Sequence, residues 1–468
     1  MLKMIGRYDE QMVLRRAANS EESEFVAVYG RRRIGKTYLV RETFDGEFAF
    51  THAGVACAGM VRQLHAFRSA LKEAGHEACP RLANWLDAFD ELKVVVKARP
   101  AAQKKIIFID EMPWMDTPKS GFVSALEHFW NAWASVRKDI LLIVCGSATS
   151  WIINKVIKDK GGLHGRVTEQ ILVAPFTLKE CEEYVKTRGI DWTHRQIAEM
   201  YMVFGGVPYY WRHLQRGMSP AQNIDQLFFA ENGSLRGEFE ELYGSLFRRK
   251  EPYVDIVTAL GRRKAGMSRD EIVAATSLAN GGRLSTYLEE LEQCGFIRRF
   301  DAIGKRSKDA IYQLIDSFTL FHFRFAAENA RREPDFWMRS LGTPVHDVWA
   351  GLAFERLCLL HRRQLKEALR IGGVSANICS WRGGDAQIDL VIDRNDGIVD
   401  ICEMKYSERP YALDAAEWAK IARRRSALRE VIGMRKAIHV VMVTAAGLVG
   451  NAWANEVQCQ VTLDDLFV

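Results

Sequence analysis

Residues 25–41, FVAVYGRRRIGKTYLVR, constrain the fold of this 468-residue chain more than any other stretch. The apolar residues 25–29 are typical of a buried parallel strand, and residues 37–43 predict a helix. Between them lies the pattern Gly-x4-Gly-Lys-Thr. Its glycines let backbone N–H groups surround a phosphate, and the start of the helix favours negative charge. The strand, loop and helix context supports a phosphate-binding loop rather than a chance match.

The loop also predicts which residues contact a nucleotide. Lys36 supplies positive charge at the β- and γ-phosphates, and the Thr37 hydroxyl is placed to hold Mg²⁺. ATP and Mg²⁺ are therefore the predicted cofactors. The predicted nucleotide contacts in this segment are Gly30, Arg31, Arg32, Arg33, Ile34, Gly35, Lys36, Thr37 and Tyr38.

A second run, KKIIFIDE at residues 104–111, ends in two adjacent carboxylates. Four apolar residues before them predict a buried strand, and ligands bind at the carboxyl ends of strands in open α/β sheets. We expect Asp110 to hold Mg²⁺, directly or through water, and Glu111 to orient and deprotonate the attacking water. Two solvated acids at a strand end are the alternative. The phosphate loop about 75 residues upstream favours the functional interpretation.

Two further segments contribute polar residues. A predicted strand at residues 140–145 is followed by Gly-Ser-Ala-Thr, and Ser147 is placed to reach the γ-phosphate or the attacking water. Ser147 and Thr149 could equally cap a helix. The loop GGLHGR ends in Arg166, which either stabilises transition-state charge, in cis or across an oligomer interface, or is an ordinary loop arginine. A GGVPYY turn at residues 205–210 closes a helical segment.

Together these motifs resemble bacterial and archaeal AAA-type ATPases near the signal-transduction (STAND) branch. The resemblance covers residues 5 to about 245. It implies a P-loop ATPase core at residues 1–175 and a helical lid at residues 176–245. In that family the Gly-x-Pro turn contacts the nucleotide and reports its state to the next domain, which assigns this role to Pro208. The Gly-Arg position of the family falls on Arg166.

Residues 246–315 carry 13 Lys and Arg against 9 Asp and Glu. A helix at 253–260, a capping box at Ser268 and Glu271, and an amphipathic helix at 283–294 precede two predicted strands. These features resemble a winged helix, and we place it with its connector at residues 246–330. In such ATPases the module often couples domains instead of binding DNA. Candidate phosphate contacts are Arg283, Arg298, Lys305, Arg306 and Lys308.

The C-terminal residues 331–468 contain two strands, 387–393 and 398–405, joined by an Asp-Gly hairpin turn. Alternation puts Glu403 and Lys405 on one face of the second strand, and the hairpin brings Asp389 beside them. Two carboxylates can hold Mg²⁺, and a nearby lysine can polarise water or steady a scissile phosphate. The alternative is a hairpin with surface acids and a surface lysine.

The arrangement D-x13-E-x-K resembles the PD-(D/E)xK nucleases. The resemblance implies catalysis by Asp389, Glu403 and Lys405, with Asp389 and Glu403 as metal ligands. Glu355, in a helix at residues 348–360, resembles the extra acid that many members carry and would also bind the metal. One departure from the family pattern is Ile388, which stands where the family has proline.

The composition limits the classes of protein to which this chain can belong. The contents of 48% hydrophobic and 26% charged residues are those of a soluble globular protein, and a net charge of +6 permits a nucleic-acid partner without requiring one. Nine cysteines without a C-x-x-C pair predict reduced thiols and no zinc site. The N-terminus lacks a signal-peptide pattern. The apolar run 437–454 is interrupted by His439 and Asn451, which indicates a buried strand and a helix rather than a membrane span.

We therefore predict an α/β chain with a P-loop parallel-sheet ATPase domain, a helical lid, a winged helix and a restriction-endonuclease-like C-terminal domain. The predicted function is a cytoplasmic, ATP-hydrolysing switch that controls a metal-dependent nuclease-like effector. Its expected partners are ATP, nucleic acid bound by the last two domains, and further copies of the chain, with no membrane. The alternatives are an ATP-dependent DNA-binding regulator and a protein-interaction switch with an inactive nuclease fold.

Overall fold

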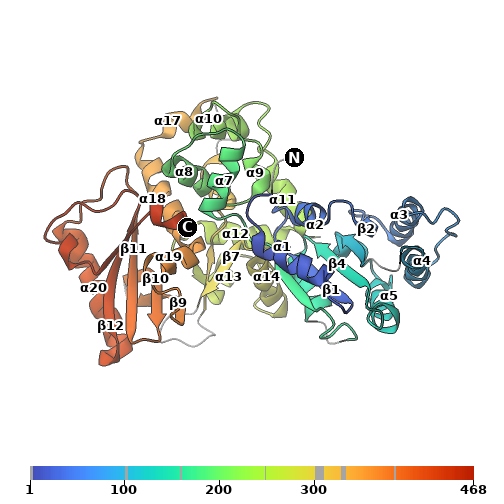
Figure 1. Cartoon of the computed structure of the whole chain (residues 1–468). Helices are drawn as coiled ribbons and strands as arrows, with labels where there is room; N and C mark the ends of the chain where they lie inside the picture. The colour runs from blue at the N-terminus through green and yellow to red at the C-terminus, as the bar shows by residue number, and fades with distance from the viewer. Residues whose placement is uncertain are drawn as a thin grey trace. The chain divides into compact units, whose positions relative to one another are not determined.

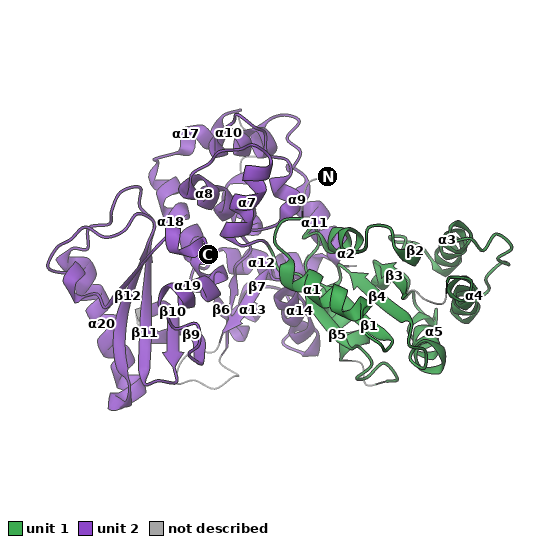
Figure 2. Cartoon of the chain, in the orientation of Figure 1, with its two compact units in different colours: residues 1–175 green, residues 176–468 purple. Residues whose placement is uncertain are grey.

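The computed structural model describes residues 4–100, 104–158, 161–247, 249–300, 310–327, 334–383 and 386–468. The chain divides into two compact units, residues 1–175 and 176–468 (Figure 2). The first unit contains the phosphate loop and the second the acid-rich hairpin, while Pro208, which is predicted to contact the nucleotide, belongs to the second unit.

The first unit is built on a parallel sheet of five strands, which confirms the predicted α/β fold. Its strands lie in the order β2-β3-β4-β1-β5, and every neighbouring pair is parallel. Strand β4 separates the strand that leads into the phosphate loop, β1, from the strand that ends in Asp110, β3. The strands are β1 (Glu24–Tyr29), β2 (Phe48–Ala53), β3 (Lys105–Asp110), β4 (Ile140–Gly146) and β5 (Glu169–Leu172).

Helices cover both faces of this sheet (Figure 1). Helices α1 (Tyr8–Ala18) and α2 (Lys36–Phe44) pack on one face, where Leu14 and Leu39 meet Val26 and Val28. Helices α3 (Met60–Glu73), α4 (Trp85–Lys97) and α5 (Phe122–Phe129) pack on the other. A strand buried on both faces needs a continuous apolar run, which explains why the three central strands, β3, β4 and β1, are almost entirely apolar and buried.

The second unit begins with helices that share one aromatic core. Tyr210 stacks on Phe318 with ring centroids 5.0 Å apart, and Phe228 contacts Phe321 at 4.9 Å. These contacts cross the predicted border at 245, and the pair of Phe229 and Phe336, with centroids 4.9 Å apart, crosses the one at 330. The finer domain limits stay predictions. The elements are α7 (Leu178–Thr187), α8 (His194–Phe204), α9 (Pro208–Trp211), α10 (Pro220–Ile224), α11 (Glu238–Leu246), α15 (Ser317–Phe321) and α17 (Phe336–Ser340).

Three short strands and three helices follow α11. The strands form an antiparallel sheet in the order β6-β8-β7, and the capping box of Ser268 and Glu271 is present at the start of α13. Strand β6 has two residues, too few for a sequence pattern to reveal. The basic turn with Lys305, Arg306 and Lys308 lies outside the described residues. The elements are α12 (Glu251–Gly261), β6 (Met267–Ser268), α13 (Arg269–Ala275), α14 (Gly282–Gln293), β7 (Ile297–Phe300) and β8 (Ile311–Leu314).

The C-terminal part is a mixed sheet in the order β13-β12-β11-β10-β9. Strands β9, β10 and β11 are antiparallel, while β11, β12 and β13 run parallel. Helix α20 covers one face, where Leu428 packs with Val391 and Ile401. The elements are α18 (Pro344–Leu360), α19 (Arg362–Ala368), β9 (Ala376–Gly383), β10 (Ala386–Arg394), β11 (Ile398–Lys405), α20 (Ala415–Ile432), β12 (Ala437–Thr444) and β13 (Cys459–Thr462).

The helix predicted after β12 is wrong. Residues 445–453 form turns and bends, and the only helical piece nearby is the 3-10 turn Ala454–Glu456. Gly447, at a φ of 87°, takes a left-handed conformation that an α-helix cannot contain, and Leu448 forms a bridge with Tyr411 instead. Within the described part of the chain, no helix is both long and apolar enough to cross a bilayer. All nine cysteines are free thiols, as expected.

Candidate functional site

The loop between β1 and α2 folds around the ammonium of Lys36. Its Nζ donates to the carbonyl oxygens of Gly30 and Arg31, each at 2.9 Å. Gly30 has a φ of 140°, and a Cβ there would lie 2.5 Å from the Val173 carbonyl oxygen. Arg33 is held at a φ of 69°, a costly conformation that is enriched where backbones bind ligands. The loop therefore has the tight, glycine-dependent course that a phosphate cradle requires.

Thr37 and Asp110 meet at the carboxyl edge of the sheet. Thr37 Oγ1 donates to Asp110 Oδ2 at 2.6 Å, and the other carboxylate oxygen accepts from the Glu111 N–H at 2.8 Å. A hydroxyl and a carboxylate are both oxygen ligands of the kind that Mg²⁺ prefers. Their separation allows both oxygens to contact one ion beside the phosphate loop, so the residues present fit Mg²⁺ with ATP.

Glu111 is oriented by the neighbouring strand β4. Ser147 Oγ donates to Glu111 Oε2 at 2.8 Å, and the Ser147 N–H donates to the same oxygen at 3.3 Å. Ala148 occupies the N-cap position of α6 (Thr149–Ile152), and no side chain caps that helix, so the capping alternative for Ser147 is wrong. Glu111 has a φ of 44°, and Gly54 is close, since a Cβ there would lie 2.4 Å from the Glu111 carbonyl oxygen.

Arg166 lies at the end of a loop that packs on α5. A Cβ at Gly162 would lie 1.7 Å from Glu127 Oε1, so the Glu127 side chain would have to move to admit one. The Arg166 N–H donates to the Leu163 carbonyl at 3.0 Å, and the residue is exposed. Its action on a nucleotide stays a prediction. The same holds for Pro208, which begins α9 in the second unit.

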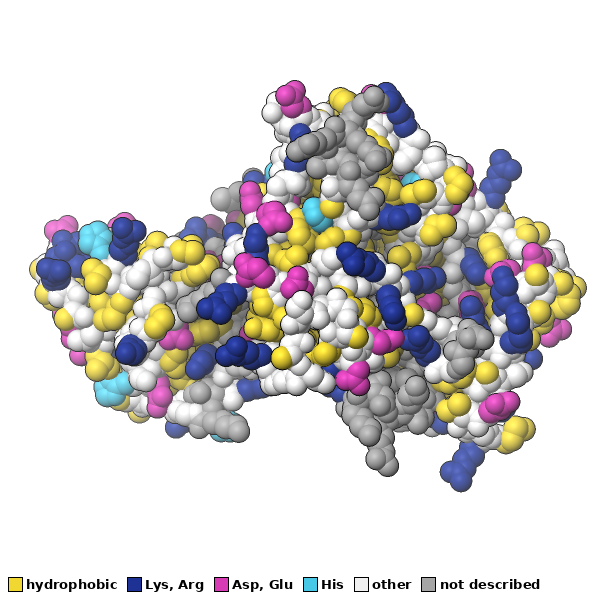
Figure 3. All heavy atoms as spheres, turned by 180° about the vertical axis from the view of Figure 1, so that it is seen from behind, with side chains coloured by type: hydrophobic (Ala, Val, Ile, Leu, Met, Phe, Trp, Pro, Cys, Tyr) yellow, Lys and Arg dark blue, Asp and Glu magenta, His cyan; other side chains and the backbone are white. Residues whose placement is uncertain are grey.

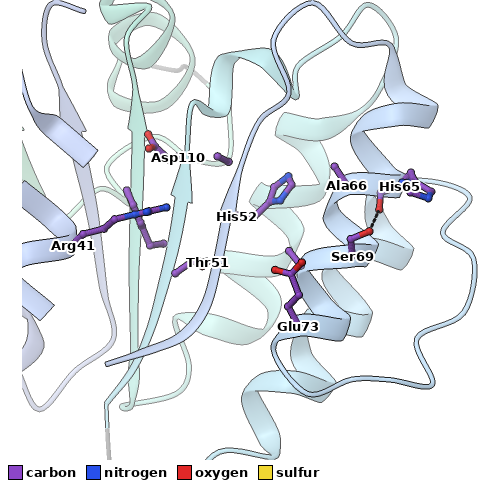
Figure 4. A pocket seen from close by; sticks show the side chains of 11 residues that line it. Arg41, Thr51, His52, His65, Ala66, Ser69, Glu73 and Asp110 are labelled. Atoms are coloured by element: carbon purple, nitrogen blue, oxygen red, sulfur yellow. Dashed lines mark hydrogen bonds between the residues drawn. The ribbon is translucent and has the colours of Figure 1, made fainter. Parts of the chain in front are cut away.

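A cavity of about 450 Å³ adjoins Asp110 at the β2 edge of the sheet (Figure 4). Burial lowers the pKa of His52 to about 4, so this imidazole is neutral at pH 7. The sequence patterns did not reveal this cavity, because its residues come from four separate elements and form no motif. Its labelled lining in Figure 4 consists of Arg41, Thr51, His52, His65, Ala66, Ser69, Glu73 and Asp110.

In the second unit, a cavity of about 70 Å³ brings together the four residues predicted for the C-terminal site. Strands β10 and β11 pair with Leu390 opposite Cys402, so the register places Asp389 opposite Glu403. Lys405 follows two residues later on β11, and Glu355 comes from α18. The full lining is Lys264, Glu355, Asp389, Cys402, Glu403, Met404, Lys405 and Arg424.

Two of these charged groups are paired with side chains of α20. Lys405 Nζ donates to Glu417 Oε2 at 2.9 Å, and Glu403 forms an ion pair with Arg424. The sequence patterns did not single out Glu417 and Arg424. The sequence does contain a signal for this pair. Glu417 and Arg424 are seven residues apart and so lie on one face of the helix, just as Glu403 and Lys405 lie on one face of β11.

The other two acids accept hydrogen bonds from residues outside α20. Glu355 Oε1 accepts from Lys264 Nζ at 2.6 Å, and Asp389 Oδ1 accepts from Gln387 Nε2 at 2.6 Å. Lys264 is 91 residues away from Glu355 in the sequence, so no local pattern could reveal the pair.

Burial affects the protonation of the acidic and basic side chains that line this cavity. It raises the pKa of Glu355 and of Glu403, and the neighbouring charge of Asp389 adds to the effect at both. Burial opposes the charge of Lys405, but the hydrogen bond to Glu417 and the neighbouring Tyr411, Glu417 and Glu403 together outweigh it, and the pKa of Lys405 is raised. Buried acids of this kind lose their protons most readily when a cation enters beside them. Loss of these protons as pH rises makes the cavity more negative, which favours a cation.

A third group also brings metal-binding atoms together. Donor atoms of His76, Cys79 and Glu91 lie within 4.8 Å of one another. His76 Nε2 and Glu91 Oε2 are hydrogen-bonded at 2.5 Å, which gives this pair a structural role. Three ligands are also one fewer than the closed set of a structural zinc site.

Known proteins are similar to this chain over much of its length. An uncharacterized protein of Methanocaldococcus jannaschii is 25% identical over 412 residues, which cover 86% of this chain and 88% of that protein. The Walker-type ATPase of Pyrococcus abyssi superposes with a TM-score of 0.51 and 18% identity over 69% of this chain and 96% of that one. The ORC2 protein of Aeropyrum pernix gives a TM-score of 0.39 at 14% identity, over 66% and 89% of the two chains.

The Pyrococcus abyssi likeness supports the fold, and a family model supports the activity class. Residues 6–214 match the model of the ATPase domain predominantly from Archaea. This match includes the phosphate loop, Asp110, Glu111 and Ser147. Residues 6–214 of this chain therefore form an ATPase domain of the archaeal type.

Proposed function

We propose that this protein is an ATP-hydrolysing switch that controls a metal-dependent nuclease-like domain at residues 331–468. The observation that carries the proposal is the cavity shared by Glu355, Asp389, Glu403 and Lys405. Its acids and its lysine are the set that phosphodiester hydrolysis uses, and an archaeal-type ATPase domain lies in the same chain.

In the ATPase domain, Lys36 would exchange its two carbonyl partners for phosphate oxygens, and Thr37 and Asp110 would hold Mg²⁺. When bound, the ion offsets the negative charge that develops on the phosphates. Glu111 orients the attacking water and accepts its proton, and Ser147 holds the Glu111 carboxylate in position. Arg166 supplies further positive charge in the transition state.

In the C-terminal domain, Asp389, Glu403 and Glu355 would hold a divalent ion. A bound ion supplies charge stabilisation at the scissile phosphate and makes a water molecule more acidic. Lys405 stays protonated because of Glu417, so it is suited to contact the phosphate rather than to accept a proton. This assigns electrostatic stabilisation to Lys405 and metal binding to the three acids.

The segment from α12 to β8 has the order of elements expected for a winged helix, and we propose that it couples the two activities. Helix α14 would be its recognition helix, but it carries Glu289, Glu290 and Glu292 and only one basic residue, Arg283. Acidic side chains oppose contact with phosphates. On the face shown in Figure 3, Lys and Arg side chains are interspersed with acidic and hydrophobic ones. Coupling between domains therefore accounts for this segment better than DNA reading.

The test uses the full chain with Mg²⁺ or Mn²⁺, with and without ATP, and several DNA and RNA forms. Asp389→Ala should lose metal binding and cleavage, and Lys405→Ala should lose cleavage but keep much of the metal affinity. The matched control is Asp393→Ala, which removes an acid of the same strand whose partner is Lys436, outside the cavity. A correctly folded wild type that binds no metal at this site would overturn the proposal.

A second candidate is an ATP-dependent switch whose nuclease fold only binds a partner. It is favoured by the ion pairs of Glu355, Glu403 and Lys405, since charges that satisfy one another can serve structure alone. Tight, Asp389-dependent metal binding without cleavage of any nucleic acid, in any nucleotide state, would support this candidate.

A further inference from the structure

We infer that Lys264 is an inhibitory cation of the C-terminal site: it takes the carboxylate that a metal ion needs, and the site becomes active when Lys264 withdraws. The inference rests on the proposed function, because it assigns regulation to the same cavity. Lys264 lies between α12 and β6, within the proposed coupling segment. Because it also lines the cavity, it links this segment to the proposed nuclease-like domain.

The central contact is between Lys264 Nζ and Glu355 Oε1, 2.6 Å apart. The Lys264 side chain is 54% exposed and that of Glu355 is 12% exposed, so the lysine reaches the acid from the solvent side. The second carboxylate oxygen of Glu355 is buried and has no hydrogen-bond partner among the described residues. A divalent ion and the ammonium therefore compete for the same acid.

A network of hydrogen bonds holds Lys264 in this position. Its carbonyl oxygen accepts from Gln313 Nε2 at 2.8 Å and from Arg356 Nη2 at 2.7 Å. Arg298, on β7, donates to Gln313 Oε1 at 2.7 Å and to the Asp389 carbonyl oxygen at 3.2 Å. The coupling segment thus contacts both α18 and β10, the elements that carry two of the proposed metal ligands.

With Lys264 in this position, the cavity is too small for a nucleic-acid substrate. Its volume of about 70 Å³ is room for an ion or a few water molecules. Ligand sites usually measure roughly 300–1,000 Å³, so a phosphodiester with its flanking nucleosides needs more space. Asp389, Glu403 and Lys405 are fixed on neighbouring strands, whereas Lys264 comes from outside the sheet. Withdrawal of the coupling segment is therefore the movement that opens the site.

The test replaces the charge and keeps the backbone contacts. Lys264→Gln retains the carbonyl that Gln313 and Arg356 bind. The matched control is Arg263→Gln, because Arg263 is the adjacent residue, is 53% exposed and pairs with Glu271 of its own segment. Mn²⁺ binding to the full, nucleotide-free chain is measured by calorimetry, and the part lost in Asp389→Ala is assigned to the C-terminal site.

We expect Lys264→Gln to tighten the Asp389-dependent Mn²⁺ affinity by about tenfold or more, the effect of one charged hydrogen bond. It should also allow cleavage of DNA without ATP. Arg263→Gln and the charge-retaining Lys264→Arg should both behave as wild type. Lys264→Met, which keeps an unbranched stem, replaces Lys264→Gln if that variant does not fold.

The outcomes separate the two proposals. Equal Asp389-dependent affinities in wild type and Lys264→Gln would overturn the inference and leave the proposed metal site intact. A lower thermal stability without any gain in metal affinity would also overturn it and would mark a purely structural ion pair. Absence of Asp389-dependent binding in every variant would overturn both the inference and the proposed function.

Discussion

Ser147 Oγ donates to Glu111 Oε2 across 2.8 Å, although 36 residues separate the two in the sequence. The contact exists because β4, which Ser147 follows, pairs with β3, which Glu111 follows. Strand β4 is thereby part of the ATPase site without any acid or lysine of its own at this edge. The orientation of the proposed general base depends on a hydroxyl of the neighbouring strand.

Ser147→Ala should lower ATP turnover by about tenfold to a hundredfold and leave ATP affinity nearly unchanged, since a hydrogen bond to a charged group contributes roughly 1.5–3 kcal/mol. Steady-state turnover and nucleotide binding are measured on the same preparation. Ser150→Ala is the control, because Ser150 is also buried and lies three residues further on, in α6. A parallel loss of affinity and turnover would instead place Ser147 on the nucleotide.

Lys36→Ala and Glu111→Gln should separate binding from hydrolysis. Loss of the Lys36 charge leaves the phosphates without their main partner, so ATP affinity should fall strongly. Glu111→Gln keeps the shape of the side chain but cannot accept a proton, so ATP should still bind while turnover stops. Equilibrium binding of a labelled nucleotide and phosphate release give the two readouts. Wild-type values for both quantities in Lys36→Ala would contradict the assignment of the phosphate loop.

In the first unit, local patterns were sufficient to predict the phosphate loop and the two acids that follow β3. The apolar strand, the glycine-rich loop and the helix around Lys36 are adjacent in sequence, and the two acids at Asp110 directly follow their strand. The insertion of β4 between β1 and β3 was not predictable, because strand order depends on contacts between segments more than 100 residues apart. The hydrogen bond between Ser147 and Glu111 follows from that order.

The C-terminal site was partly predictable for the same reason. Alternation along β11 and the Asp-Gly turn are local features of the sequence. They predict that Asp389, Glu403 and Lys405 lie close together, and the three residues line one cavity in the structure. The ion-pair partners of Glu355 and Glu403 were not predicted, because Lys264 and Arg424 come from other elements. The helix expected after β12 does not form, because backbone hydrogen bonds join Gly447 and Val449 to Tyr411, which is too distant in the sequence for a local pattern to reveal.

Arg166→Ala should lower turnover far more than ATP affinity if its guanidinium acts on the transition state. Arginine residues in this role contribute roughly 10³–10⁵-fold in rate. His164→Ala, an exposed side chain of the same loop, is the control. Mixing Arg166→Ala with Lys36→Ala protein then tests for a shared site, because restored activity requires the arginine of one copy to act on the nucleotide of another. Proportional losses of affinity and turnover would exclude this role.

His361 should make the stability of the second unit depend on pH. Its Nε2 accepts from the Leu178 N–H at 3.0 Å, and Nδ1 lies 2.9 Å from the Leu357 carbonyl oxygen, which leaves no acceptor for a second proton. Burial lowers the pKa of His361 to about 4. The unfolded chain, with a pKa near 6.5, binds the proton that the folded chain rejects. The free energy of unfolding therefore falls as pH drops from about 6.5 to about 4.

Between pH 7 and pH 5, this linkage amounts to about 2 kcal/mol for one imidazole. His361→Gln, whose amide oxygen can accept from Leu178 without titrating, should lose that part of the pH dependence in urea unfolding. The exposed His128→Gln should keep the wild-type dependence. An unchanged dependence in His361→Gln would show that His361 is not the group responsible.

Gly206→Ala should destabilise the second unit through direct steric conflict at the turn before Pro208. A Cβ at Gly206 would lie 1.9 Å from the Phe176 carbonyl oxygen, and the Phe176 N–H donates to the Gly206 carbonyl at 2.6 Å. All nearby atoms belong to backbone, so no side chain can rotate away. We expect a loss of about 3 kcal/mol in the free energy of unfolding, at the upper end for overpacked sites.

The control for this prediction is Gly237→Ala, before α11. Gly237 has a φ of −89°, and an added Cβ would meet no atom within 4 Å, so stability should stay within about 0.5 kcal/mol of wild type. Urea unfolding followed by tryptophan fluorescence compares the two variants. A mild effect at Gly206 would mean that the turn can shift away from Phe176. A turn that yields to one methyl group would be poorly suited to the role predicted for Pro208, which is to report the state of the nucleotide to the next domain.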